Sequence, residues 1–281
     1  MLKVKDYSLY LVISEEYALG KDAVEIAELA IAGGVDIIQL REKNKHRDKL
    51  IKLAVELSRI CKANSVTFIV NDDPLLAKEA DADGVHLGQE DVKKYSISAT
   101  REIIGKNKVI GVSTHSLVEL EKANSEDVDY IAYGPIYPTK TKDYFLGAGD
   151  IKAALSVAKK PLVFIGGINL TNLDEILAEG ARNIAVIRGI IQAADISAMA
   201  RNFKHRIMQA KKETKMIIKI NGKDQVIEGS LNLLELVISK KLAPESVVLE
   251  HNLSIVPKEE WENVSLREND SLEIVSFMGG G

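Results

Sequence analysis

The sequence predicts an α/β protein in which a (β/α)8 TIM barrel is followed by a small α+β unit. The first observation is that short β-type runs alternate with helical stretches over residues 1–209, eight times in all. Eight such units are the number that closes a parallel sheet into a barrel. The second observation is that the alternation then stops, and a hairpin, one helix and further strands follow. A chain of 281 residues has room for both units.

The β-type runs of the barrel are short and apolar, which is typical of strands buried on both faces. They cover Leu9–Ile13, Ile37–Leu40, Thr67–Val70, Gly84–Leu87, Val109–Val112, Tyr130–Tyr133, Leu162–Ile165 and Asn183–Ile187. Apolar residues at helical spacing lie between them, at Val24–Ala32, Leu50–Ala63, Leu117–Ala123, Ile151–Ala158, Leu173–Ala178 and Ile196–Met208. An open doubly wound sheet has a similar alternation. The barrel is favoured because no glycine-rich dinucleotide motif follows the first run.

Capping residues mark the ends of several predicted helices. Asp73 followed by Pro74 is typical of an N-cap with proline at the first helical position. Gly33-Gly34 and Gly180 follow helical stretches and suit left-handed C-terminal caps. Cys61 is the only cysteine, so we expect a buried thiol and no disulfide.

Composition and charge exclude several classes of protein. A net charge of -4 argues against a bulk electrostatic grip on nucleic acid, but leaves room for a small basic pocket that binds a phosphorylated metabolite. The N-terminal residues show no signal-like pattern, and no stretch approaches the roughly 20 apolar residues of a membrane helix. We therefore expect a cytoplasmic protein that binds neither nucleic acid nor membranes.

The second unit is predicted from residue 216 to residue 281. Residues 210–215 are polar and charged without apolar periodicity, and they predict a linker after the barrel at 1–209. The Asn221-Gly222 pair predicts a hairpin turn, and Ser230 is the expected N-cap of a helix over Leu231–Lys241. The expected strands are Met216–Ile220, Gln225–Glu228, Val247–Glu250, Leu253–Val256 and Leu272–Phe277.

Residues at the carboxyl ends of the barrel strands are the candidates for function, because the active sites of such barrels gather there. The second run ends in Gln39, Arg41 and Lys43, which share one face because alternate residues of a strand point the same way. One amide and two cations suit a polyanion such as pyrophosphate.

Acidic and amide side chains follow the third and fourth runs. Asn71 and Asp72 follow the third run and Asp91 follows the fourth, so the two carboxylates are expected at the same rim. Such a pair suits Mg²⁺, which is typically held by one or two carboxylates and by substrate phosphate oxygens. We expect His86 to be a hydrogen-bonded wall residue of the site, with an acid–base role as the alternative.

Hydroxyl groups, a lysine and glycines follow the later runs. A loop that carries hydroxyls and cations is suited to fold over an anionic substrate. Glycines after the seventh and eighth strands of a barrel commonly bind phosphate through backbone N–H groups. The candidates are Ser113 after the fifth run, Thr139, Thr141 and Lys142 in the loop 134–142, Gly166 and Gly167 after the seventh run, and Arg188 and Gly189 after the eighth.

Six motifs in order resemble thiamine phosphate synthase across residues 1–209. They are QLREK at 39–43, VNDD at 70–73, GVHLGQED at 84–91, GVSTHS at 111–116, GPIYPTKTK at 134–142 and FIGGIN at 164–169. That family joins hydroxymethylpyrimidine pyrophosphate to thiazole phosphate and releases pyrophosphate. The resemblance implies a Mg²⁺-dependent transferase with a dissociative mechanism, in which pyrophosphate leaves first and the thiazole nitrogen captures a pyrimidine cation.

The resemblance also implies a role for each candidate residue. The residues that it places on the pyrophosphate are Arg41, Lys43, Asn71 and Lys142. The Mg²⁺ ligands that it implies are Asp72 and Asp91, and the pyrimidine would be held by Gln39 and Ser113. The thiazole phosphate would be held by Thr139, Thr141, Gly167 and the loop after the eighth strand. The residues that it implies to be catalytic are Arg41, Lys43, Ser113 and Lys142.

Arg188 departs from the pattern, because the family usually has serine at this place. The arginine would clamp the thiazole phosphate directly, or it would swing outward and leave the contact to backbone amides. The alternative activity is that of a thiazole tautomerase, a close relative of the synthase. Retention of the pyrophosphate and Mg²⁺ residues argues against it, since a tautomerase handles no pyrophosphate. The resemblance also implies a possible homodimer.

Residues 215–281 resemble the thiamine sulfur carrier, a ubiquitin-like β-grasp protein. The motifs are INGK at 220–223, IVPKEEW at 255–261 and LEIVSFMGGG at 272–281. The resemblance implies that a partner adenylates the carboxylate of Gly281, which then carries sulfur as a thiocarboxylate to a thiazole synthase. Glycines suit this task because, lacking Cβ, they thread a narrow channel. The alternatives are a ubiquitin-like docking module and a molybdopterin-type sulfur carrier.

Overall fold

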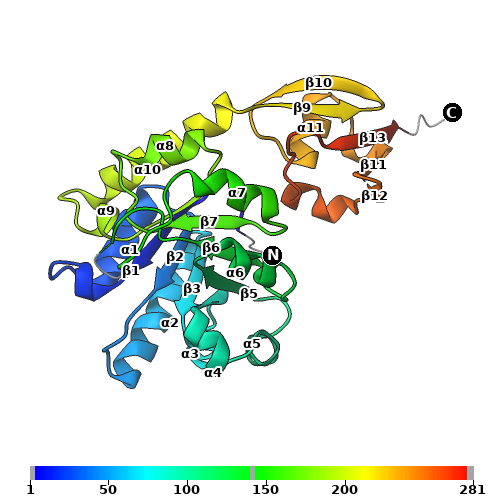
Figure 1. The fold of residues 1–281 in the computed structure, drawn as a ribbon. Coiled ribbons are helices and arrows are strands. Elements are labelled where there is room, and N and C mark those ends of the chain that lie inside the picture. The colour runs from blue at the N-terminus through cyan, green and yellow to red at the C-terminus, as the bar shows by residue number, and fades with distance from the viewer. Residues whose placement is uncertain (1–3, 140–142, 277–281) are drawn as a thin grey trace. The chain divides into compact units, whose positions relative to one another are not determined.

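The computed structural model describes residues 4–139 and 143–276. Contacts divide the chain into two units, residues 1–207 and residues 208–281. In the first unit, eight strands form a closed barrel in chain order from β1 to β8 (Figure 1). Every neighbouring pair is parallel, and β8 closes the ring by pairing with β1. The predicted barrel is confirmed, and the open doubly wound sheet is excluded.

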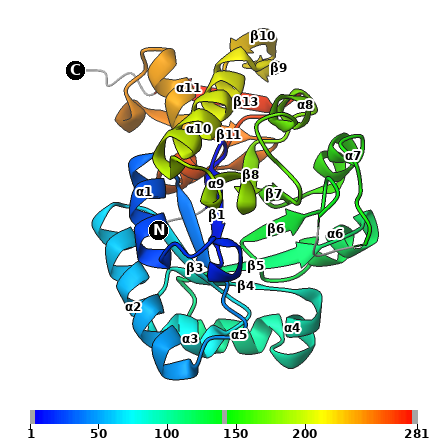
Figure 2. The same cartoon turned by 90° about the vertical axis from the view of Figure 1, so that its left-hand side faces the viewer.

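The barrel strands agree with the predicted runs to within two residues at each end. They are β1 (Leu9–Ile13), β2 (Ile37–Leu40), β3 (Thr67–Asn71), β4 (Gly84–Leu87), β5 (Val109–Thr114), β6 (Tyr130–Tyr133), β7 (Leu162–Ile165) and β8 (Asn183–Val186). Helices lie outside the ring of strands (Figure 2). They are α1 (Ala23–Ala32), α2 (Arg47–Ala63), α3 (Pro74–Glu79), α4 (Gln89–Lys94), α5 (Ile97–Ile104), α6 (Leu117–Asn124), α7 (Asp150–Val157), α8 (Leu173–Ala178), α9 (Arg188–Ile191) and α10 (Ile196–Glu213), with a 3-10 turn at η1 (Glu15–Tyr17).

The barrel interior is filled by alternate residues of the strands. On β1, Tyr10 and Val12 belong to the interior cluster, whereas Leu9, Leu11 and Ile13 are also buried but lie on the opposite face. Both faces of the strand are therefore covered, which explains why the run is apolar throughout. The interior cluster includes two tyrosines, Tyr10 and Tyr130, among its aliphatic members.

The predicted helix ends are confirmed where the structure describes them. The side chain of Asp73 accepts a hydrogen bond from the backbone N–H of Leu76 at 2.9 Å, and Pro74 opens α3. Gly34 and Gly180 have φ of 92° and 96°, the left-handed conformation that ends a helix. Cys61 is buried on α2, as expected.

The second unit is a five-stranded mixed sheet with one α-helix. The strand order is β10-β9-β13-β11-β12, and β13 runs parallel to β9. The elements are β9 (Lys215–Ile220), β10 (Lys223–Glu228), α11 (Leu233–Ser239), η2 (Pro244–Ser246), β11 (Val247–His251), β12 (Ser254–Ile255), η3 (Lys258–Asn263) and β13 (Ser271–Ser276). The hairpin turn lies at Asn221 and Gly222, both with positive φ. The unit has a core of its own, which contains Trp261, Leu236 and Leu249.

Two predictions about the start of the second unit are wrong. Residues 210–213 are not a linker, because α10 continues to Glu213. The segment lacks an apolar stripe, yet it consists of good helix formers, and Gln209 donates to Glu213 one turn later at 2.8 Å. Ser230 does not cap α11. Asn232 does, in a reciprocal capping box with Glu235.

Among the described residues, no helix is long and apolar enough to cross a membrane.

Candidate functional site

A cavity of about 950 Å³ opens where the barrel strands end. Most of the residues singled out from the sequence line it. They are Arg41, Lys43, Asn71, Asp72, His86, Asp91, Ser113, Thr139, Gly166, Gly167, Arg188 and Gly189. Three further candidates, Thr141, Lys142 and Gly281, lie outside the described residues.

Two carboxylates meet at one edge of the cavity. Asp72 follows β3 with φ of 65°, a strained conformation for a residue with a side chain, and its N–H donates to the backbone oxygen of His86 at 2.8 Å. Asp91 lies in the first turn of α4. Burial, a hydrogen bond to Asp91 and the charge of Asp91 raise the pKa of the Asp72 carboxyl to about 6. The two side chains are thus close enough to repel each other when both are ionised.

Arg41 and Lys43 bring positive charge to the same edge. Their charges oppose the rise in the pKa of Asp72, so both cations lie within electrostatic reach of that carboxylate. The backbone of Arg41 is fixed by its N–H, which donates to the carbonyl of Ile13 at 2.9 Å. In the part of the chain that the structure describes, neither cation forms an ion pair within 4 Å. Cations held in a cavity without an ion-pair partner suit an anionic ligand.

The pair of carboxylates fits a divalent cation. The described residues contain no cluster of three or more His, Cys, Asp or Glu, so a transition-metal site of that kind is absent among them. Mg²⁺ needs only one or two carboxylates when substrate phosphates complete its shell. A divalent cation between Asp72 and Asp91 would also remove the repulsion that raises the pKa of Asp72.

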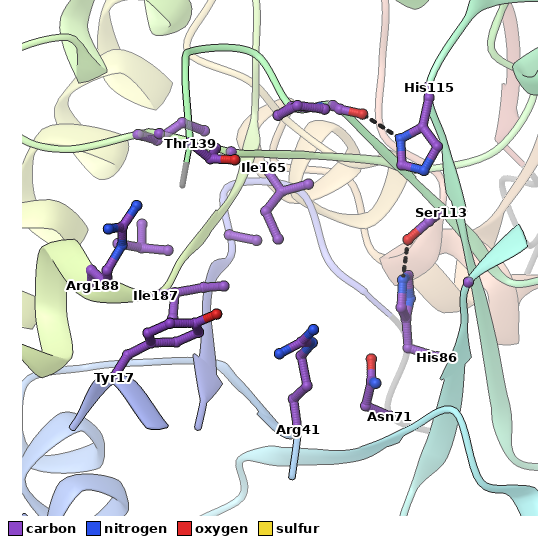
Figure 3. A pocket seen from close by; sticks show the side chains of 18 of the residues that line it. Tyr17, Arg41, Asn71, His86, Ser113, His115, Thr139, Ile165, Ile187 and Arg188 are labelled. Carbon is purple, nitrogen blue, oxygen red and sulfur yellow. Dashed lines mark hydrogen bonds between the residues drawn. The ribbon is translucent and has the colours of Figure 1, made fainter. Parts of the chain in front are cut away.

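The opposite side of the cavity combines glycines with a cation. Gly166 and Gly167 both have positive φ, and a Cβ on Gly167 would lie 2.8 Å from the carbonyl oxygen of Pro138. Only glycine fits this close approach. The guanidinium of Arg188 lies over the ring of Tyr17, 5.9 Å from its centroid. Figure 3 shows one side of the cavity with Asn71, His86 and Ser113, the other with Tyr17 and Arg188, and Arg41 between them.

Gln39 occupies a different place from the one expected for a ligand-binding residue. Its side chain is buried and is not among the residues that line the cavity. Its amide nitrogen donates instead to the hydroxyl of Tyr10 at 2.8 Å. Direct binding of a substrate by Gln39 stays a prediction.

His86 is a buried wall residue. Its Nδ1 lies 2.9 Å from the hydroxyl of Tyr130, and its Nε2 lies 2.9 Å from the hydroxyl of Ser113. Burial lowers the pKa of the imidazole to about 4, so the ring is neutral at pH 7. A neutral ring with both nitrogens engaged fits the expected structural role better than that of a general base.

Several cavity residues were not singled out from the sequence as site residues, although one of them, His115, falls within the GVSTHS motif. Tyr17 lies in the turn after β1, and Gln192 fixes it by donating to its carbonyl oxygen at 2.9 Å. His115 lines the cavity after β5 and is held by the carbonyl oxygen of Gly134 at 2.6 Å (Figure 3). Single polar residues in loops are too common for a pattern to single them out. In the sequence, Tyr10 and Tyr130 look like ordinary core residues, because each lies in an apolar run.

The fold and this cavity define a TIM-barrel enzyme whose site lies at the carboxyl ends of the strands. The chain belongs to the family described as Thiamine monophosphate synthase, which matches residues 9–190, and residues 217–281 match the ThiS family. The barrel is therefore a transferase fused to a ThiS-type unit, as the two resemblances implied.

Individual relatives agree with this assignment for the barrel. The chain is 39% identical to a thiamine-phosphate synthase of Persephonella marina over 71% of this chain and 95% of that protein. It is 37% identical to the thiamine-phosphate synthase of Halalkalibacterium halodurans, again over 71% of this chain and 95% of the relative. A solved thiamine phosphate pyrophosphorylase from Pyrococcus furiosus superposes with a TM-score of 0.67 and 30% identity, over 73% of this chain and 96% of that one.

Proposed function

We propose that the barrel couples hydroxymethylpyrimidine pyrophosphate with thiazole phosphate to give thiamine phosphate and pyrophosphate. One observation carries the proposal: Arg41 and Lys43 form no ion pair with any residue that the structure describes, and they share a cavity edge with the Asp72–Asp91 pair. A pyrophosphate group is the ligand that would use both features at once, because its oxygens would meet the cations directly and the carboxylates would hold the Mg²⁺ that accompanies it.

The residues of the cavity support bond cleavage by charge stabilisation. Arg41 and Lys43, with Asn71 beside them, hold the pyrophosphate as the carbon–oxygen bond breaks and the bond's electron pair leaves with the oxygen. Asp72 and Asp91 would hold Mg²⁺, which when bound would further neutralise that oxygen charge. The pyrimidine is left as a carbocation, and no side chain has to act as a nucleophile.

The second substrate is held from the other side of the cavity. The thiazole phosphate would lie against Gly167, Thr139 and Arg188. A glycine backbone that a ligand can approach closely and one cation suit a phosphate there. Its ring nitrogen would then face the pyrimidine carbon and donate its lone pair to the cation. Holding both rings in one cavity replaces a bimolecular collision by a local step.

The decisive measurement is pyrophosphate release by the full chain supplied with both substrates. We expect release that depends on both substrates and on Mg²⁺, and that stops on chelation. A thiazole tautomerase would convert its substrate without forming pyrophosphate. No release above background, together with conversion of the thiazole alone, would sink the synthase proposal in favour of that alternative.

We propose separately that the second unit carries sulfur on the carboxylate of Gly281. The match to the ThiS family, which extends to residue 281, supports this function. The partners would be an adenylating enzyme, a sulfur donor and a thiazole synthase. Intact-mass analysis after incubation with the first two and ATP tests it. We expect a gain of about 16 Da, since one carboxylate oxygen is replaced by sulfur.

A chain that lacks Gly279, Gly280 and Gly281 is the matched control for sulfur carriage. It should gain no mass, and we expect it to release pyrophosphate at the wild-type rate. A full chain that stays unmodified with its cognate partner would instead favour a docking module. Modification only by a molybdopterin-type partner would favour the other alternative.

A further inference from the structure

A line of hydrogen-bonded side chains crosses the barrel interior and ends at the cavity. The amide of Gln39 on β2 donates to the hydroxyl of Tyr10 on β1 at 2.8 Å. The Tyr10 hydroxyl lies 2.9 Å from that of Tyr130 on β6, and Tyr130 lies 2.9 Å from Nδ1 of His86 on β4. The last link joins Nε2 of His86 to the hydroxyl of Ser113 on β5, also 2.9 Å long. Five strands thus contribute one member each.

With the nitrogen of the Gln39 amide facing Tyr10, only one direction of donation leaves no hydrogen unpaired on the two buried tyrosines. The amide nitrogen of Gln39 is a donor, so the Tyr10 oxygen accepts from it and the Tyr10 hydrogen points to Tyr130. The Tyr130 oxygen is then an acceptor toward Tyr10, and its own hydrogen is donated to Nδ1 of His86. A neutral imidazole that accepts at Nδ1 carries its proton on Nε2. That proton is donated to the oxygen of Ser113.

The reverse direction leaves the buried hydrogen of Tyr10 without an acceptor, whereas the favoured direction leaves only the hydrogen of Ser113, which lines the cavity. If Tyr130 donated to Tyr10, the Tyr10 oxygen would accept from two donors and its own hydrogen would have no acceptor among the described residues. An unpaired buried hydroxyl hydrogen costs more free energy than a hydrogen bond contributes. Tyr10 and Tyr130 are both 2% exposed or less, so water does not supply the missing acceptor at the surface.

The barrel makes room for this line. Gly111 pairs with Tyr130 across β5 and β6, and a Cβ at Gly111 would lie 2.5 Å from the Tyr130 hydroxyl oxygen. The ring of His86 stacks on that of Tyr130, with centroids 5.5 Å apart and an interplanar angle of 24°. The stacking therefore fixes the orientation of both rings and holds the hydroxyl of Tyr130 beside Nδ1 of His86.

We propose that Tyr130 is a positioning residue that acts through His86 to turn the Ser113 hydroxyl hydrogen toward the cavity. Because the Ser113 oxygen accepts from Nε2, its own hydrogen has no acceptor among the residues that the structure describes and is available to a ligand. The site thus selects a substrate whose ring presents a hydrogen-bond acceptor, such as an unprotonated ring nitrogen, to Ser113. The identity of that ring as the pyrimidine rests on the proposed function. The direction of donation along the hydrogen-bonded line is independent of the proposed function.

Nitrogen NMR of the imidazole tests the direction without any substrate. In the full chain labelled with ¹⁵N-histidine, His86 is assigned by the signals that disappear in His86→Gln. We expect a bare Nδ1 and a protonated Nε2 in the wild type. In Tyr130→Phe, Nδ1 loses its donor, so we expect averaged shifts from both tautomers. A protonated Nδ1 in the wild type, or wild-type shifts in Tyr130→Phe, would overturn the proposal.

Steady-state kinetics test the consequence for the substrate. We expect Tyr130→Phe to lower kcat/KM for the pyrimidine pyrophosphate about tenfold, the scale of one lost hydrogen bond. The KM for thiazole phosphate should stay within about twofold, since that substrate does not face Ser113. Tyr133→Phe is the matched control, because Tyr133 lies on the same strand but outside the interior cluster that contains Tyr130 and Ala132. Unchanged kcat/KM in Tyr130→Phe would refute the inference.

A second pair of variants serves if Tyr130→Phe fails to fold. His86→Gln places an amide N–H within reach of Ser113, whereas His86→Met has similar bulk and no donor. We expect the glutamine variant to keep more of the wild-type kcat/KM than the methionine variant. Equal loss in both would overturn the role of His86 as a donor. A wild-type chain without pyrophosphate release would refute the proposed function but leave the NMR result standing.

Discussion

The ring of Tyr130 fills the space that a side chain at position 111 would need. A Cβ built on Gly111 would lie 2.1 Å from Cζ of Tyr130, which is far inside van der Waals contact. The two residues pair directly across β5 and β6. Glycine at this position is therefore set by the tyrosine and not by backbone conformation.

Gly111→Ala should destabilise the barrel by about 1–3 kcal/mol, because overpacking forces the ring or the strands to move. Urea unfolding followed by far-UV circular dichroism measures the change. Gly149→Ala is the control, since a Cβ there meets nothing within 4 Å and φ is −60°. A Gly111→Ala chain as stable as the wild type would contradict the contact.

Asp72→Asn and Asp91→Asn should each lower Mg²⁺-dependent turnover about 10- to 100-fold or more. Thermal unfolding separates this effect from damage to the fold. Mg²⁺ should raise the Tm of the wild type, because a ligand that binds only the folded state stabilises it. It should raise the Tm of neither variant. Asp48→Asn, at an exposed carboxylate of α2, should behave as the wild type. A Tm that rises equally in all four chains would refute the metal assignment.

The imidazole of His86 should titrate with a pKa of about 4 in the folded chain. The folded pKa lies below the value of about 6.5 in an unfolded chain. Above pH 6.5 the ring is neutral in both states, so its titration does not lower the free energy of unfolding. As the pH falls from 6.5 toward 4, the unfolded chain takes up the proton first and the free energy of unfolding decreases. Proton NMR of the His86 ring between pH 3 and pH 8 measures the pKa. A value near 6.5 would contradict the burial of the ring.

Arg188→Met should raise the KM for thiazole phosphate about tenfold and change the KM for the pyrimidine substrate little, because Arg188 lies across the cavity from His86 and Ser113. Arg188→Ser introduces the serine that the resemblance implies at this place, and its KM for thiazole phosphate should fall between those of the wild type and of Arg188→Met. Arg201→Met, at an exposed position of α10, is the control for loss of charge. An Arg188→Met chain with wild-type kinetics would place the phosphate elsewhere.

The fluorescence of Trp261 should report the unfolding of the second unit alone. It is the only tryptophan of the chain, it is 2% exposed, and its Nε1 donates to the carbonyl oxygen of Val256 at 2.9 Å. Because the two units have separate cores, the fluorescence transition in urea should not coincide with the circular dichroism transition, which the barrel dominates. Coincident curves would show that the two units unfold together.

The sequence predicts those elements whose signal, an apolar pattern or a capping residue, lies within the element itself. All eight barrel strands were predictable, because each is a short run buried on both faces, and the Asp73 cap was predictable from the proline that follows it. The end of α10 was not, because residues 210–213 are helical by propensity and carry no apolar stripe. Asn232 was missed as a cap because Ser230 stands two residues earlier and is an equally good cap by type.

The residues of the candidate site also divide into those that the sequence predicts and those that it does not. Arg41, Lys43, Asp72 and Asp91 were predictable because charged residues at strand ends of a barrel must meet at one rim. Tyr10 and Tyr130 were not, because an aromatic residue in an apolar run looks the same whether its hydroxyl is idle or engaged. Gln39 shows the same limit: its place on β2 was predictable, but its partner on β1 was not.

Tyr10 and Tyr130 limit which substitutions the barrel interior can accept, whether they are made to stabilise the protein or arise during evolution. Replacing Tyr10 by phenylalanine preserves shape and volume, so a comparison of structures would register almost nothing. The change would nevertheless leave the amide of Gln39 without its acceptor and remove the donor that orients Tyr130. Redesign of this interior by packing alone would therefore remove the hydrogen bonds that orient Ser113 at the cavity, and a family tree of such barrels should show positions 10, 39 and 130 changing together.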